Sequence, residues 1–199
     1  MSSITANPLS HPARLTSLAQ PFRFLWRHRL LLRQTAANDI RARYAGSVLG
    51  PAWLVLYPLL FLGVYALTYI YIFKVRFALF DSNEYVALIF CGLIPFLGVS
   101  EALSAGVGSV TQNASLLKNT LFPIDLVPVK AVLVSQCTQA VGTGLLLVTI
   151  LFLGKLTWWA LLLPVAWAGQ ILFSIGLLWI LSSLNVFFRD LQNLVSVAI

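Results

Sequence analysis

Five aromatic side chains recur at every fourth position inside one long uncharged stretch, and they are the residues whose type and spacing most suggest chemistry. They are Trp53, Tyr57, Phe61, Tyr65 and Tyr69. Residues four apart share one face of a helix, so this spacing predicts a ladder of rings able to stack on flat partners. Trp and Tyr normally collect at the two membrane interfaces, which makes a ladder through the membrane unusual. Taken by themselves, these residue types favour a structural role for the rings, in packing against lipid or other helices.

Catalytic and cofactor-binding patterns are missing from the sequence. It contains no G-x-x-x-x-G-K-[ST] loop to cradle ATP phosphates, no G-x-S-x-G nucleophile motif and no paired acids inside an apolar run. The two histidines, His11 and His28, form no metal-ligand cluster with cysteines or acids. We therefore expect no enzyme, no metal and no cofactor in this chain, but a membrane conduit or a scaffold.

A few polar residues at the ends of apolar runs are candidates for local roles. Glu101 ends the second run, and we expect a helix-end carboxylate in contact with water or paired with an arginine such as Arg43, although acids placed there are often functional. Arg189 and Asp190 are expected to hold the turn before the last apolar run through charge-assisted hydrogen bonds to the backbone. A direct substrate role for them is the alternative.

The composition is that of an integral membrane protein. Of 199 residues, 59% are hydrophobic and only 10% are charged, against about 25% charged in soluble domains. The net charge of +7 comes largely from arginines that precede the first apolar run, which is typical of a cytoplasmic flank near anionic lipid head groups and argues against nucleic acid. These are Arg14, Arg23, Arg27, Arg29, Arg33, Arg41 and Arg43. Cys91 and Cys137 lie in apolar runs and are expected to be buried free thiols.

The chain before the first apolar run divides into two parts. Residues 1–20 are rich in Ser, Pro, Ala and Thr, and we expect a disordered cytoplasmic lead. Residues 21–45 combine arginines with aromatic anchors, which predicts an amphipathic interface helix; a solvated cytoplasmic helix is the alternative. Gly46 and Gly50 then allow a sharp turn, and Pro51 suits the first turn of the next helix. Residues 46–199 are the transmembrane domain.

The transmembrane domain is predicted to be an all-α bundle of four complete spans and the start of a fifth. The spans are residues 51–73, 85–108, 131–153 and 158–184, with a fifth from about 191. Gly92, Pro95 and Gly98 predict a kinked second span, with a re-entrant hairpin as the alternative. Gln136 and Gln139 predict that one face of the third span packs on other helices or lines a cavity.

The loops determine the expected orientation. With the N-terminus inside, ten of the thirteen Lys and Arg residues fall on the cytoplasmic side, which favours a cytoplasmic N-terminus. The polar segment 109–128, which contains two prolines, is then a short cytoplasmic helix with turns. Residues 191–199 are too few to cross a bilayer as a helix, so we expect the chain to be cut off at the start of a fifth span or to end in an interfacial stub.

Four strings in order carry a resemblance to a known family. They are DIRARYAGSVLGPAW followed by Tyr57-Pro58, then CGLIPF, NASLLKNTLFPIDLVP and NVFFRDLQNLV, which together span most of residues 34–199. The chain resembles the transmembrane subunit of ATP-binding-cassette polysaccharide exporters, which move O-antigen, capsular or teichoic acid chains. Any one string is weak, whereas four in register are specific for the family and silent on the polymer.

The resemblance implies an assembly in the bacterial inner membrane. It implies a homodimer of six-span subunits and two separate ATPase subunits that hold ATP and Mg²⁺, acting on a lipid-linked polysaccharide. It also implies that a cytoplasmic coupling helix seats in the ATPase, and exposed leucines there need a protein partner; folding back onto the base of the bundle is the alternative. The residues concerned are Asn113, Leu116, Leu117, Lys118, Leu121, Phe122 and Pro123.

The resemblance also turns the aromatic ladder into a predicted conduit. Sugar rings present flat C–H faces that stack on Trp and Tyr, and modest contacts let a long polymer slide past. Trp53 is then an entry platform, and Arg41, Arg43 and Tyr44 form an entrance for the lipid anchor, expected to be a polyprenyl diphosphate. The alternatives are an exporter of drugs or other lipids and a membrane scaffold without a conduit.

Overall fold

The computed structural model describes residues 19–72, 82–113 and 123–199, and within them every regular element is helical. Four of these helical segments are long and apolar enough to cross a membrane: Gly50–Ile72, Glu84–Gln112, Leu126–Phe152 and Trp158–Phe187. The predicted fold class, an all-α multi-pass membrane protein, is confirmed.

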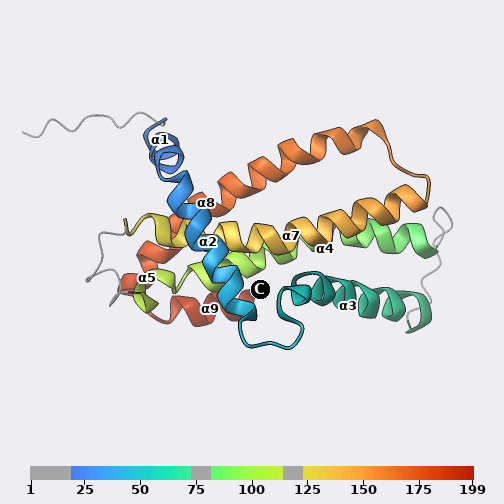
Figure 1. The fold of residues 1–199 in the computed structure, drawn as a ribbon, viewed down its shortest axis with the longest axis horizontal. Helices are drawn as coiled ribbons and strands as arrows, with labels where there is room; N and C mark the ends of the chain where they lie inside the picture. The colour runs from blue at the N-terminus through green and yellow to red at the C-terminus, as the bar shows by residue number, and fades with distance from the viewer. Residues whose placement is uncertain (1–18, 73–81, 114–122) are drawn as a thin grey trace, which may run out of the picture.

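The elements follow one another with short connections (Figure 1). The N-terminal region forms α1 (Ala19–Arg27) and α2 (Arg29–Tyr44). The first span comprises a 3-10 turn η1 (Gly50–Ala52), α3 (Trp53–Leu67) and a π-helical turn η2 (Thr68–Ile72). The remaining elements are α4 (Ser82–Gly106), α5 (Ser109–Gln112), α7 (Leu126–Phe152), η3 (Trp158–Leu162), α8 (Leu163–Phe187) and α9 (Leu191–Ala198).

Helix α7 is the centre of the bundle and packs against α2, α3, α4, α5 and α8. Two apolar cores lie along it. One joins α2, α4, α7 and α8 through buried residues such as Leu32, Ala102 and Leu178, and the other joins α3, α4 and α7 through Leu62 and Phe90. As a result α8 packs on the α4–α7 pair at the end near α1 and α9, and α3 packs on it at the opposite end (Figure 1).

Small residues on α4 allow its close packing. Gly98, Ala102 and Gly106 follow one another at four-residue steps, which is the spacing that brings membrane helices together. A Cβ atom on Gly98 would lie 2.0 Å from Gln139 Oε1, and one on Gly106 would lie 2.7 Å from Leu178 Cδ1. Ala102 is completely buried. This stripe fixes α4 against α7 and α8.

Helix α2 is anchored to α7 on one side. Leu32 and Ala36 are its buried residues, and Lys130 Nζ lies 2.8 Å from Asp39 Oδ2. The basic segment expected as one amphipathic helix is thus two helices that meet at His28, whose Nδ1 lies 2.9 Å from the Phe24 carbonyl oxygen. Its location at a membrane interface remains a prediction.

Two features of the spans differ from the expectation or decide between alternatives. Helix α4 runs unbroken through Pro95, so the re-entrant hairpin is excluded in favour of one long helix. Helix α7 begins at Leu126, ahead of the predicted residue 131. Pro128, at the end of the segment expected as a short cytoplasmic helix with turns, lies in the first turn of α7, where its missing N–H would have had no helical partner.

The turns follow the glycines as predicted. Gly46 and Gly50 have φ values of 80° and 50°, and Pro51 lies in the first turn of η1. Gly154, with φ of 67°, ends α7: its N–H donates to Leu151 O at 3.0 Å, and the next residue, Lys155, donates to Ile150 O at 3.2 Å. This pair of bonds is a Schellman motif, and it directs the chain back towards α8.

The turn between α8 and α9 is held by a residue that the sequence did not single out. Asn185 is buried, and its Oδ1 accepts from the Gln192 backbone N–H at 3.2 Å. The predicted side-chain bonds of the adjacent pair are not seen: Asp190 makes no side-chain capping hydrogen bond, and both Arg189 and Asp190 are exposed. The buried Asn185 amide thus supplies the hydrogen bond that holds the turn. Arg189 and Asp190 are exposed, so their charged groups can hydrogen-bond to water and need no protein partner.

The cysteines are free, as expected, but they are not buried. Cys91 lies on the exposed surface of α4, and Cys137 is half-buried on α7. Both helices bury only one face, and Cys91 lies outside the buried face of α4 while Cys137 lies at the edge of that of α7.

Candidate functional site

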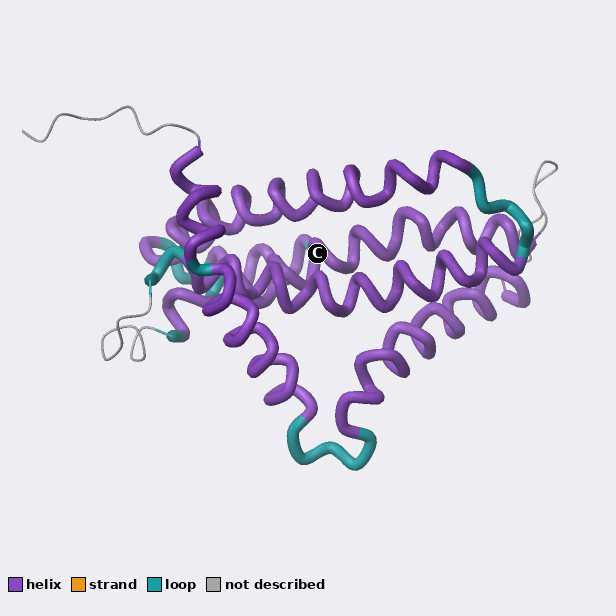
Figure 2. The backbone as a smooth tube through the Cα atoms, turned by 45° about the horizontal axis from the view of Figure 1, so that its top comes forward, coloured by secondary structure: helices purple, strands orange, loops and turns teal. Residues whose placement is uncertain are grey.

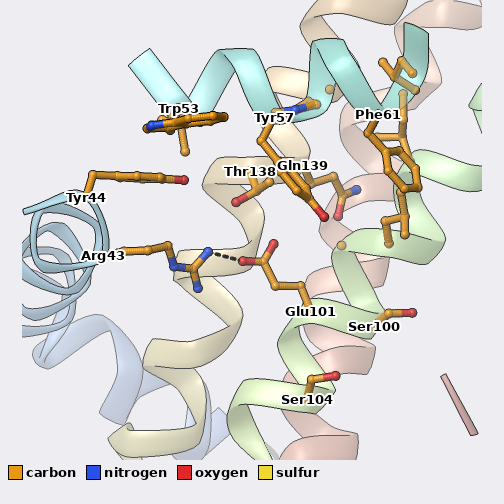
Figure 3. A pocket seen from close by; sticks show the side chains of 17 residues that line it. Arg43, Tyr44, Trp53, Tyr57, Phe61, Ser100, Glu101, Ser104, Thr138 and Gln139 are labelled. Carbon is orange, nitrogen blue, oxygen red and sulfur yellow. Dashed lines mark hydrogen bonds and ion pairs between the residues drawn. The ribbon is translucent and has the colours of Figure 1, made fainter. Parts of the chain in front are cut away.

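A cavity of about 520 Å³ lies where α2, α3, α4 and α7 meet. Figure 2 shows why these four helices meet: α2 and α3 form an open V, with the loop between them at its apex, and both arms reach the bundle. The volume lies within the usual range for small-molecule sites, about 300–1,000 Å³. Its labelled lining residues are Arg43, Tyr44, Trp53, Tyr57, Phe61, Ser100, Glu101, Ser104, Thr138 and Gln139 (Figure 3).

One wall of the cavity is aromatic. Trp53, Tyr57 and Phe61 project from successive turns of α3, and Tyr44 comes from the end of α2 (Figure 3). The ring centroids of Tyr57 and Phe61 are 6.3 Å apart and stacked, so the rings follow one another along the helix as the four-residue spacing predicts. Tyr57 remains largely exposed, at 62%. The wall therefore offers ring faces that no protein group covers completely.

The opposite wall is polar and contains an ion pair. Arg43 Nη1 donates to Glu101 Oε1, which confirms the pairing predicted for Glu101. Burial by itself lowers the pKa of Arg43, but the hydrogen bond and negative charge of Glu101 outweigh it, so the pKa of Arg43 is raised from its ordinary value. Both side chains remain partly exposed, at 41% and 27%, so the pair lies at the edge of the cavity.

Amide side chains behind the polar wall hold α7 against α8 and α4. Gln139 and Gln170 donate to each other at 3.0 and 2.8 Å, and Gln170 Nε2 also donates to the Pro95 carbonyl oxygen at 3.1 Å. Trp167 Nε1 donates to Gln136 Oε1. Both alternatives predicted for the polar face of α7 are realised, because it packs on other helices and also lines a cavity.

We expect Gln139 and Gln170 to be energetically coupled. Each single leucine substitution leaves the other amide without its reciprocal partner and is expected to lower the free energy of unfolding by about 1 kcal/mol. The double substitution removes both amides together and is expected to cost less than the sum of the two. The free energy of unfolding is measured in mixed micelles for the unmodified chain, the two single variants and the double variant, which together form a double-mutant cycle. Strictly additive losses would contradict a direct contact.

The structure separates residues that the sequence grouped together. Tyr65 and Tyr69 do not line this cavity but pack against the core formed by α3, α4 and α7. Arg41 is exposed on α2 and does not line the cavity, whereas its predicted partners Arg43 and Tyr44 do. Most of the predicted coupling helix, residues 114–122, lies outside the described residues. Its flanks are described: Asn113 follows α5, and Pro123 lies three residues before α7.

Sequence reasoning missed two hydroxyl groups of the polar wall. Ser100 and Ser104 lie on α4 beside Glu101 and line the same cavity. Ser104 comes three residues after Glu101, a spacing that places both on one helix face, so the signal was present. The helix that faces them across the cavity could not be read from that spacing.

Comparison with known proteins finds relatives of one kind. The chain is 32% identical over 175 residues to the O-antigen export system permease protein RfbA of Myxococcus xanthus, covering 87% of this chain and 65% of that protein. Two proteins of the same name from Klebsiella pneumoniae are 33% and 31% identical over 169 and 166 residues, each covering 81% of this chain and 61% of the relative. No protein-family model matches. The chain thus spans slightly less than two thirds of the length of these curated relatives.

Proposed function

We propose, from its similarity to O-antigen export system permease proteins, that the chain is the membrane-spanning subunit of an ATP-driven exporter of lipid-linked polysaccharide. Export proceeds across the bacterial inner membrane. The observation that carries the proposal is the similarity over 81–87% of the chain, together with a cavity that has one aromatic wall and one polar wall.

The distribution of charge supports a cytoplasmic N-terminus. Helices α1 and α2, which carry most of the arginines, lie at the end of the bundle with α5 and α9 (Figure 1). Lys130 of α7 pairs with Asp39 of α2, and Arg189 lies in the turn between α8 and α9. The opposite end, with the α7–α8 turn, carries Lys155, whose Nζ lies 3.1 Å from Glu84 Oε1. An excess of Lys and Arg marks the cytoplasmic side of a membrane protein.

Transport is assigned to this chain and ATP hydrolysis to a partner. Two ATPase subunits bind ATP and Mg²⁺ and act on a homodimer of permease subunits. The segment between α5 and α7 is the proposed contact with the ATPase, because the two helices that flank it pack against each other at the basic end of the bundle, which is proposed to be cytoplasmic.

The polysaccharide and its anchor are assigned to neighbouring parts of the molecule. Sugar rings pass along the cytoplasmic half of the aromatic ladder, where Trp53, Tyr57 and Phe61 line the cavity. The phosphate groups of a polyprenyl diphosphate anchor are drawn to the basic end of α2, where Arg41 is exposed. Arg43, held by Glu101, forms the boundary between the two regions.

The decisive experiment is transport by a reconstituted complex. The chain is coexpressed with a candidate ATP-binding-cassette ATPase from its host, purified and placed in vesicles loaded with the host's lipid-linked glycan. We expect the ATPase to copurify and the glycan to cross the membrane only when ATP is hydrolysed.

Two results would contradict the proposal. Absence of any copurifying ATPase would favour a scaffold without a conduit. ATP-dependent movement of a cationic drug or a simple lipid, with no movement of glycan, would favour an exporter of another class. An ATPase variant unable to hydrolyse ATP serves as the matched control for passive leakage.

A further inference from the structure

We propose that the cavity between α2, α3, α4 and α7 is a subsite for one uncharged, polyhydroxylated ring of the substrate, with Glu101 as its hydrogen-bond acceptor. The inference rests on the proposed export function and makes it more specific. It assigns this site to a neutral sugar ring rather than to the phosphate groups of the anchor, and it gives Arg43 the role of positioning Glu101.

The charges of the cavity argue against an anion. Of the described residues that line it, only Arg43 and Glu101 are charged, and they pair with each other. A phosphate group that approached Arg43 would have to displace the Glu101 carboxylate and would meet its negative charge. An ionised carboxylate only accepts hydrogen bonds, so it favours a ligand that supplies O–H donors.

Hydrogen-bonding capacity remains unused on the polar wall. Arg43 occupies Oε1 of Glu101, and among the described residues no group donates to Oε2. Figure 3 shows this second oxygen turned away from Arg43 towards the cavity, on the side where Thr138 lies. The Thr138 hydroxyl also makes no hydrogen bond within the described part of the chain. A ring with several hydroxyl groups can hydrogen-bond to Glu101 Oε2 and to the Thr138 hydroxyl at the same time.

The aromatic wall suits the other face of such a ring. Figure 3 shows the rings of Trp53 and Tyr44 edge-on, one above the other, with the ion pair of Arg43 and Glu101 below them. Tyr57 and Phe61 continue this wall along α3. A pyranose has an apolar C–H face and a rim of hydroxyl groups, and a site that has one aromatic wall and one polar wall matches both.

Helix packing keeps the acceptor in place. Glu101 lies between Gly98 and Ala102 of the small-residue stripe, and Gly98 is in close contact with Gln139 of α7. Arg43 fixes the carboxylate from the side of α2. The packing of α4 on α7 thus fixes the backbone that carries Glu101, and Arg43 holds its carboxylate, which together give the support that a specific subsite needs.

Binding of small uncharged glycosides tests the inference without requiring transport. The purified full chain is titrated with a panel of methyl hexosides, and saturation-transfer NMR detects weak binding. We expect at least one hexoside to bind, excess inorganic pyrophosphate to leave its binding unchanged, and Glu101→Gln to weaken it roughly tenfold, since hydrogen bonds to a charged acceptor are about twice as strong as neutral ones. Thr138→Val, which is close in shape, is expected to weaken it about threefold.

The matched control is Glu84→Gln, which removes a carboxylate that is also held in an ion pair, with Lys155, but at the far end of the bundle. It is expected to bind the hexoside as the unmodified chain does. Failure of every hexoside to bind, equal binding by the Glu101→Gln and Glu84→Gln variants, or displacement of the hexoside by pyrophosphate would each overturn the inference. ATP-driven glycan transport by a chain that binds no hexoside would overturn only this subsite, whereas hexoside binding without transport would contradict only the exporter.

Discussion

Replacing Gly98 with leucine is expected to lower the free energy of unfolding by about 3 kcal/mol, the upper part of the range for overpacking. A Cβ atom at this position would lie 2.0 Å from Gln139 Oε1, 2.8 Å from Gln139 Cδ and 3.1 Å from Gln139 Cβ. The last distance matters most, because the Cβ atom of Gln139 moves only with the backbone of α7. The substitution must therefore separate α4 from α7 and break the bonds between Gln139 and Gln170.

The matched control for this substitution lies on the same helix. Gly92 is exposed, and a Cβ atom there meets nothing within 4 Å. Gly92→Leu is therefore expected to leave stability unchanged or to raise it by up to about 1 kcal/mol, because leucine is the better helix former. Unfolding of both variants in mixed micelles makes the comparison. Equal losses at the two positions would contradict close packing at Gly98 as the cause of its loss.

Replacing Tyr57 with leucine is expected to reduce polysaccharide export about three- to tenfold while leaving stability unchanged, since a stacking contact contributes roughly 0.5–1.5 kcal/mol. Tyr57 lines the cavity and is 62% exposed, so little packing is lost with its ring. Export is measured as glycan reaching the cell surface at matched permease levels. Unchanged export would remove Tyr57 from the conduit.

Tyr65 provides the contrast within the same ladder. Its ring lies 4.6 Å from that of Phe61 and packs against the core of α3, α4 and α7, outside the cavity. Tyr65→Leu is therefore expected to lower the free energy of unfolding by about 1 kcal/mol and to leave export by the folded protein near normal. If it reduced export as strongly as Tyr57→Leu at full stability, the conduit would extend along the whole ladder.

The sequence determined the features that depend on composition and local geometry. Apolar runs of sufficient length predict helices in a bilayer, because every backbone polar group must be satisfied within its own segment. The positive φ angles at Gly46, Gly50 and Gly154 follow from residues without a Cβ atom. The pairing of Glu101 with Arg43 was also predictable, since a carboxylate at a helix end in a basic environment seeks a cation.

The tertiary structure alone decided which of these features meet. The ladder is continuous along the helix, yet only its first three rings line the cavity, because α3 passes from the junction with α2 onto the core of α4 and α7. The four-residue spacing of Gly98, Ala102 and Gly106 was visible in the sequence, but the partners of that stripe, Gln139 and Leu178, were not. Helical periodicity specifies a face and not its neighbour, so the contacts between distant segments depend on how the side chains of all the helices fit together.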